Sequence, residues 1–79
     1  MENKHNITIY STPTCPYCNM AKDYLKKKGV AYKDFNVGAD AKAADEMIRK
    51  SGQMGVPVID VDGRIMVGFR KEVLDSLIS

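Results

Sequence analysis

The polar and apolar positions along the chain divide it into short stretches with a period of two and longer stretches with the period of a helix. Short runs rich in β-branched and aromatic residues predict strands, and they lie at 7–11, 30–37, 58–61 and 64–67. The second run alternates apolar and polar residues through its middle, as a half-buried strand does. Asp62-Gly63 separates the last two runs and is a strong hairpin signal, so these two strands should pair antiparallel.

Three longer stretches carry apolar residues on one face at helical spacing. They predict helices over about 16–28, 41–51 and 70–78. Gly29 and Gly52 are C-terminal stop signals for the first two helices. The apolar stripes are best explained as core positions, and they comprise Met20, Ala21, Tyr24 and Leu25, then Ala43, Ala44, Met47 and Ile48, then Val73, Leu74, Leu77 and Ile78.

The predicted element order is strand, helix, strand, helix, then strand, strand, helix. The first two strands are joined through a helix, so they should pair in parallel by a right-handed crossover. Helices on both faces of a four-stranded mixed sheet give the most economical packing. We therefore predict an α/β fold in a single domain over residues 1–79, with residues 1–6 as a flexible tail.

Composition and charge narrow the class of protein. The chain is 44% hydrophobic and 28% charged, with a net charge of +2, which is ordinary for a soluble globular domain. The basic run Lys26-Lys27-Lys28 ends a predicted helix, where cations complement the helix dipole, and this explains it better than a nucleic-acid-binding patch does. The N-terminal residues resemble neither a signal peptide nor a membrane segment, so we expect a cytoplasmic protein. We expect a monomer that binds neither nucleic acid nor a membrane, and we give no role to His5.

Both cysteines of the chain lie in Thr14-Cys15-Pro16-Tyr17-Cys18, where the first strand leads into the first helix. Pro16 suits the first helical position, because its missing N–H costs nothing there, and this makes Cys15 the N-cap residue. The first turn presents unpaired N–H groups and a partial positive charge, which stabilise a thiolate. Cys18 lies about one turn further along the same face. We therefore predict that Cys15 is the exposed nucleophile and Cys18 the resolving thiol.

The cysteine pair fits a structural role less well than a catalytic one. A structural disulfide would close a very small loop and would constrain little of the unfolded chain. A structural zinc site commonly uses two such pairs, and this chain has one, so zinc would need a dimer. An interaction domain without chemistry leaves an exposed thiol pair unexplained. No metal site is predicted.

Several features together resemble the glutaredoxin family. They are Tyr10-Ser11 ahead of Cys15-Pro16-Tyr17-Cys18, Val56-Pro57 after the second predicted helix, and Gly68 after the hairpin. The similarity extends over about 7–77 in the family's element order. It implies a thioredoxin-like fold, thiol–disulfide exchange by the two cysteines, and a cis bond before Pro57.

The resemblance also implies a groove for the disulfide substrate. The backbone of Val56 could pair with an extended thiol substrate. Phe69 is expected to pack under the last helix, with its backbone N–H toward the substrate. The residues expected to contact substrate are Pro16, Tyr17, Gln53, Val56, Pro57, Gly68, Phe69 and Arg70.

The chain departs from the family pattern at positions that hold glutathione. Thr12 stands where many glutaredoxins have a lysine, and Arg70-Lys71 stands where they have an acidic pair that holds the γ-glutamyl end. A cation there could bind a glutathione carboxylate, but the ammonium end would lose its partner. Gly68-Phe69-Arg70 is more similar to the glutaredoxin-like redoxins that reduce ribonucleotide reductase and take electrons from thioredoxin reductase. Cys15-Pro16-Tyr17-Cys18 is more typical of true glutaredoxins.

The resemblance leaves two electron donors open, glutathione and thioredoxin reductase. The expected partners are disulfide-containing proteins, with ribonucleotide reductase among the candidates. No tightly bound cofactor is expected, and glutathione would act as a co-substrate. Some glutaredoxins hold an iron–sulfur cluster between two subunits with glutathione, so a glutathione-dependent cluster- or metal-binding module is the alternative function.

Overall fold

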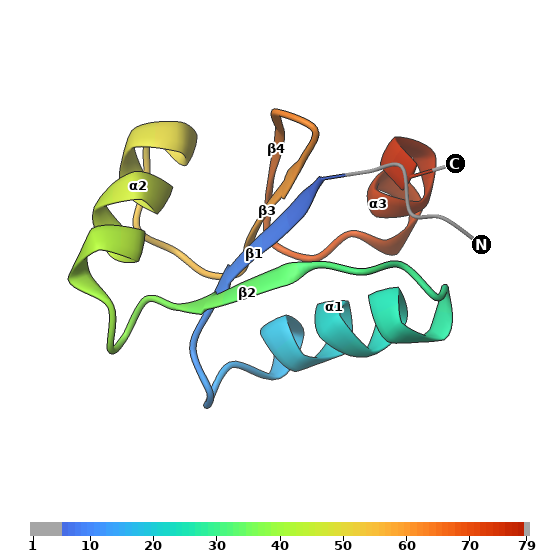
Figure 1. Ribbon diagram of the computed structural model, residues 1–79, viewed down its shortest axis with the longest axis horizontal. Coiled ribbons are helices and arrows are strands. Elements are labelled where there is room, and N and C mark those ends of the chain that lie inside the picture. The colour runs from blue at the N-terminus through green and yellow to red at the C-terminus, as the bar shows by residue number, and fades with distance from the viewer. Residues whose placement is uncertain (1–5, 79) are drawn as a thin grey trace.

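The computed structural model describes residues 6–78 and follows the predicted element order (Figure 1). None of the helices in this part of the chain has the length and apolar character needed to cross a membrane. The predicted tail, with His5, lies outside the described residues except for Asn6, whose backbone N–H donates to Asp62 Oδ1 at 2.7 Å. The elements are β1 Ile7–Ser11, α1 Pro16–Lys27, β2 Lys33–Asn36, α2 Ala41–Ser51, β3 Val58–Val61, β4 Arg64–Val67 and α3 Lys71–Ile78.

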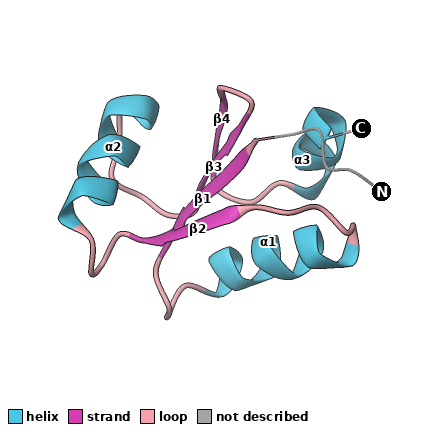
Figure 2. Ribbon diagram, in the orientation of Figure 1, coloured by secondary structure: helices cyan, strands magenta, loops and turns pink. Residues whose placement is uncertain are grey.

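The four strands form one mixed sheet in the order β2-β1-β3-β4 (Figure 2). β1 and β2 are parallel and connected through α1, whereas β3 is antiparallel to both of its neighbours. Asp62 and Gly63 have φ angles of 53° and 90° in the β3–β4 turn, as the favoured two-residue hairpin turn requires. The predicted fold class and hairpin are therefore confirmed.

The second strand is shorter than its predicted range of 30–37, which is wrong at both ends. Gly29 has a φ of 71°, and the backbone N–H of Val30 donates to the carbonyl of Leu25 at 3.0 Å. This is the helix-ending geometry in which the chain stays bonded to the last turn. The ladder with β1 therefore begins only at Lys33, opposite Thr8.

The sheet separates two apolar clusters, because alternate side chains of each strand point to opposite faces. α1 and α3 cover one face and α2 covers the other (Figure 1). The α1 and α3 side contains Ile7, Ile9, Ala21, Leu25, Ile59, Val61, Met66 and Leu74. The α2 side contains Tyr10, Ala43, Met47 and Val58. The predicted placement of helices on both faces is confirmed.

Candidate functional site

Cys15 caps the N-terminus of α1, as the sequence predicts. Its backbone is extended, with φ −91° and ψ 112°, and Pro16 occupies the first turn. Cys15 Sγ accepts a hydrogen bond from the backbone N–H of Cys18 at 3.2 Å. The first turn of α1 contains no acidic side chain, so the positive end of the helix dipole faces this sulfur without a competing carboxylate.

Cys18 differs sharply from Cys15 in its surroundings. Its side chain is fully buried, whereas Cys15 is half-buried, and both thiols are free. Burial raises the pKa of Cys18 to about 11, with a further contribution from its hydrogen bond with Cys15. A backbone hydrogen bond from Thr12 acts in the opposite direction. Cys18 is therefore a protonated thiol at neutral pH, held behind a more accessible sulfur.

A small polar cluster joins α1 to β1 and β2 on the face of the sheet that α1 and α3 cover. Lys22 Nζ lies 3.0 Å from Asp34 Oδ2, and Ser11 Oγ donates to Asp34 Oδ1 at 2.7 Å. The Lys22 side chain is only 19% exposed, so it is more enclosed than an ordinary solvated helix lysine. Its charge slightly opposes the burial effect on the pKa of Cys18.

A groove of about 380 Å³ lies beside the motif and is called the substrate groove below. It joins the exposed ring of Tyr17 to the Val56-Pro57 pair and the segment after β4. The bond between Val56 and Pro57 is cis. The Gly68 N–H donates to the Pro57 carbonyl at 2.8 Å, and the φ of Gly68 is 81°. The lining residues are Tyr17, Val56, Pro57, Val67, Gly68, Phe69 and Arg70.

Most of the expected substrate contacts meet in this groove, but two do not line it. Pro16 forms the first turn of α1. The Gln53 side-chain amide donates to Ser51 Oγ at 3.2 Å and to the Gly55 carbonyl at 3.0 Å, so it organises its own loop. Val67 was not among the expected contacts; as the last residue of β4 beside Gly68, it could have been inferred from the hairpin register.

Phe69 packs against the core cluster on the α1 and α3 side, with its ring 5.9 Å from that of Tyr24 on α1. It also lines the substrate groove. Arg70 lies just before α3 and is exposed, so its charge is available at the groove. The carbonyl of Arg70 accepts from the backbone N–H of Leu74 at 2.9 Å, in the manner of a helix cap.

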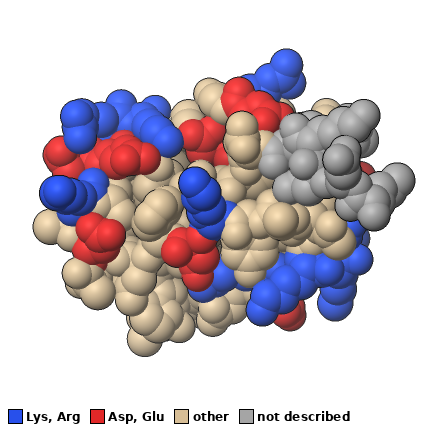
Figure 3. Space-filling model, viewed as in Figure 1, with Lys and Arg blue, Asp and Glu red and all other residues tan. Residues whose placement is uncertain are grey.

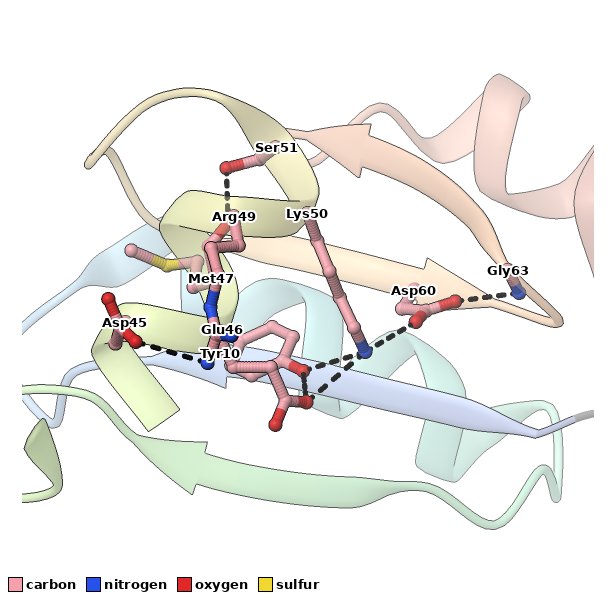
Figure 4. A network of polar contacts seen from close by, with 9 residues as sticks. All are labelled: Tyr10, Asp45, Glu46, Met47, Arg49, Lys50, Ser51, Asp60 and Gly63. Carbon is pink, nitrogen blue, oxygen red and sulfur yellow. Dashed lines mark hydrogen bonds and ion pairs between the residues drawn. The ribbon is translucent and has the colours of Figure 1, made fainter. Parts of the chain in front are cut away.

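A second polar network lies on the α2 side of the sheet and was not found by sequence reasoning (Figure 4). The buried Tyr10 hydroxyl donates to Glu46 Oε1 and accepts from Lys50 Nζ at 3.0 Å. Lys50 Nζ also lies 2.9 Å from Asp60 Oδ2. The pKa of Glu46 is lowered most by its hydrogen bond with Tyr10 and next by its hydrogen bond with Lys50. The pKa of Lys50 is raised most by its hydrogen bond with Tyr10 and next by its hydrogen bond with Asp60. The network fastens α2 to the sheet, and none of its residues lines the substrate groove.

Comparison with known proteins agrees with this geometry. The family model described as glutaredoxin matches residues 7–66, which include the cysteine pair, the Val56-Pro57 pair and most of the hairpin. The chain belongs to the glutaredoxin family. A glutaredoxin-like 8.6 kDa protein in the rubredoxin operon of Clostridium pasteurianum is 54% identical over 72 residues, covering 91% of this chain and 96% of that protein. Glutaredoxin 3 of Escherichia coli (strain K12) is 40% identical over 63 residues, covering 80% of this chain and 76% of the relative.

Solved structures place this glutaredoxin in the thioredoxin-like fold. The thioredoxin-like protein BC3987 superposes with a TM-score of 0.86 at 35% identity, over 91% of this chain and 99% of that one. The glutaredoxin-like protein NrdH-redoxin from Escherichia coli superposes with a TM-score of 0.81 at 28% identity, over 91% and 93% of the two chains. Membership of the family and the fold supports thiol–disulfide oxidoreductase activity in general terms, with the two nearby cysteines as the redox-active centre.

Proposed function

We propose that this protein is a dithiol oxidoreductase in which Cys15 attacks disulfides and Cys18 resolves the product. The observation that carries the proposal is the placement of Cys15 Sγ at the N-terminus of α1, 3.2 Å from the backbone nitrogen of Cys18. The half-buried sulfur faces helix N–H groups, while the resolving thiol is buried behind it. These surroundings favour a thiolate at the first position and a thiol at the second.

The reaction proceeds in two exchanges. In the first, Cys15 thiolate forms a bond to one sulfur of the substrate disulfide, and the other substrate sulfur leaves as a thiolate. In the second, Cys18 gives up its proton and attacks Cys15 Sγ, which releases the remaining substrate sulfur. The substrate gains two electrons, and the enzyme keeps a Cys15–Cys18 disulfide. A reductant then returns two electrons to that disulfide.

The charges of Arg70-Lys71 affect which reductant this segment can bind. Arg70 lines the substrate groove, and a guanidinium pairs well with a carboxylate such as those of glutathione. Among the described residues, no acidic side chain lines the groove to hold the γ-glutamyl ammonium. The name of the NrdH-redoxin structure describes a glutaredoxin-like protein with a thioredoxin-like activity profile. This combination supports two donors for this chain, glutathione and thioredoxin reductase.

The partners that fit are disulfide-containing proteins, with ribonucleotide reductase a candidate, in the cytoplasm. Glutathione would act as a co-substrate, without a tightly bound cofactor. Among residues 6–78, no three His, Cys, Asp or Glu side chains are grouped so that they could hold a metal ion. The family match and the named relatives do not favour the cluster-binding alternative over thiol–disulfide exchange.

The decisive experiment supplies the oxidised protein with an excess of a disulfide substrate, NADPH and one of two reducing systems, and follows loss of NADPH. One system is glutathione with glutathione reductase, and the second is thioredoxin reductase alone. Turnover with glutathione would assign this chain to the glutathione-dependent members of the family. Turnover only with thioredoxin reductase would assign it to the redoxins that serve ribonucleotide reductase. Absence of turnover with both systems would overturn the proposed function.

A further inference from the structure

A second and larger groove lies between α1 and α3, away from the cysteines along α1. Its volume is about 570 Å³, and we call it the α1/α3 groove. Its apolar lining consists of Met20, Tyr24 and Phe69, and its charged lining consists of Lys27, Lys28, Lys71 and Asp23. The two aromatic rings lie 5.9 Å apart at an angle of 55°. An apolar lining with charged side chains around it is typical of a recognition site rather than of a solvated helix face.

The charge of the α1/α3 groove is predominantly positive. Three lysines line it against one carboxylate. In Figure 3, Lys and Arg atoms gather at the lower right of the molecule, where Figure 1 places α1. The basic run at the end of α1 complements the dipole of its own helix. The structure adds Lys71 from the start of α3 to the same groove, where a cation is unfavourable to its own helix.

The lysines of the groove differ in how far their charges are neutralised. Lys28 Nζ lies 3.1 Å from Asp75 Oδ1 and 5.6 Å from the centre of the Tyr24 ring. The charge of Lys71 contributes a little to the lowered pKa of Asp75, but neither Lys27 nor Lys71 forms an ion pair within residues 6–78. Two cations without a directly bound carboxylate therefore border an aromatic lining, and they suit a ligand that brings carboxylates of its own.

The α1/α3 groove borders the substrate groove at Phe69. Phe69 lines both of them, and Arg70 of the substrate groove is followed directly by Lys71 of the α1/α3 groove. A polypeptide whose disulfide occupies the substrate groove would therefore have the α1/α3 groove next to it, at Phe69. This proximity favours a segment of the redox partner over an unrelated ligand.

We propose that the α1/α3 groove docks an acidic segment of the protein whose disulfide is reduced at Cys15. Carboxylates of that segment pair with Lys27 and Lys71, and an apolar or aromatic side chain packs on Tyr24 and Phe69. The inference rests on the proposed function, because it names the chemistry of the partner that the dithiol serves. Such charged contacts raise the specificity and the association rate of the complex more than they raise its affinity.

Binding without chemistry tests the docking surface. The probe is a fluorescein-labelled peptide of about twelve residues, a length that spans a groove of this kind when extended. It contains Glu, Asp and one Phe but no Cys, and its counterpart carries Gln and Asn instead of the acids. We expect the reduced protein to bind the acidic peptide and not the neutral one, with affinity falling as salt is raised. Fluorescence anisotropy measures both. Equal binding of the two peptides, or no binding of either, overturns the inference.

Two charge-matched double variants locate the site. Lys27→Gln/Lys71→Gln removes the unpaired cations of the groove, and Lys26→Gln/Lys42→Gln removes two exposed lysines that do not line it. We expect the first pair to weaken acidic-peptide binding by about fivefold to tenfold and the second by less than about twofold. Equal weakening by the two pairs would mean that only net charge matters, which overturns the site.

Kinetics separate a failure of docking from a failure of the proposed function. Two disulfide-linked peptide substrates are compared, one with an acidic tail and one with a neutral tail. We expect Lys27→Gln/Lys71→Gln to raise KM for the acidic substrate alone, with kcat unchanged. Reduction of both substrates with equal KM by the unchanged protein overturns the docking inference and leaves the oxidoreductase intact. Reduction of neither overturns the oxidoreductase, and the anisotropy measurements then decide the docking surface independently.

Discussion

The backbone N–H of Cys18 donates to Sγ of Cys15 across 3.2 Å, so the two cysteines of the motif are in direct contact at the start of α1. The same short stretch of helix buries the thiol of Cys18 completely and leaves that of Cys15 half-buried. This difference in exposure supports the proposed roles, in which Cys15 attacks the substrate disulfide and Cys18 resolves the product.

Replacing each cysteine separately should distinguish the first exchange step from the second. Cys15→Ser should reduce turnover to the level without enzyme, because a hydroxyl at this position is not a thiolate nucleophile. Without added glutathione, Cys18→Ser should stop the cycle at the mixed disulfide between Cys15 and the substrate, because no second thiol of the protein remains to attack Cys15 Sγ. Mass spectrometry of the intact protein after addition of substrate detects that adduct. Continued turnover by Cys15→Ser would contradict the assigned roles.

The buried thiol should make the stability of the reduced protein depend on alkaline pH. The folded-state pKa of Cys18 is raised to about 11, mainly by burial, whereas a free cysteine titrates near about 8.5. The folded state therefore holds the proton more tightly, and its advantage is fully present below about pH 8.5 and is lost as pH rises toward about 11. We expect the urea midpoint to fall across this window.

Cys18→Ala supplies the control for this titration. Tyrosines and lysines also titrate at alkaline pH, so the measured quantity is the difference in slope between the unchanged protein and the variant. The unchanged protein should lose stability more steeply between about pH 8.5 and about 11. Parallel slopes for the two proteins would show that Cys18 titrates normally.

The cysteine centre was predictable because its signals are local. A strand, a proline at the first helical position and a thiol one turn later all lie within one short stretch, and the structure places Cys15 at the N-cap as that spacing indicates. The start of β2 was not predictable in the same way. The range 30–37 alternates in part like a strand, but a hydrogen bond from Val30 to Leu25 keeps its beginning on the helix. Strand pairing with a distant β1 decides where the ladder starts.

Contacts between distant segments could not be predicted from the sequence patterns either, because they too depend on how the elements pack. Lys27 has an adequate local explanation at the end of α1 and Lys71 has none at the start of α3, and only the packing of α1 beside α3 brings them to one groove. Asp60 on β3 accepts from Lys50 on α2, and no local pattern in the sequence indicates that contact. Periodicity identifies which face of an element is buried, but it does not identify the polar partners that meet across elements.

The network on the α2 side should contribute to stability and not to catalysis. Tyr10→Phe removes the buried hydroxyl that joins Glu46 and Lys50, and we expect a loss of about 0.5–1.5 kcal/mol in the free energy of unfolding. Turnover should be unchanged, because no residue of the network lines the substrate groove. Urea denaturation and the NADPH assay measure the two effects.

A matched control for that variant is Tyr32→Phe. The Tyr32 ring also packs against a core cluster, but its hydroxyl makes no hydrogen bond within residues 6–78. We expect its free energy of unfolding to change by less than about 0.5 kcal/mol. An equal loss in both variants would mean that the hydroxyl of Tyr10 contributes nothing specific through Glu46 and Lys50.

We expect Arg70 to contribute to the binding of thiols that carry a carboxylate. It is exposed and lines the substrate groove, so its guanidinium is placed to pair with a carboxylate of glutathione. We expect Arg70→Gln to raise KM for glutathione by about threefold to tenfold. kcat should change little, because the pairing is equally present before and during sulfur transfer. Arg49→Gln on α2, which lies outside the groove, should leave both constants unchanged. An unaltered KM in Arg70→Gln would remove this residue from glutathione binding and would favour thioredoxin reductase as the electron donor.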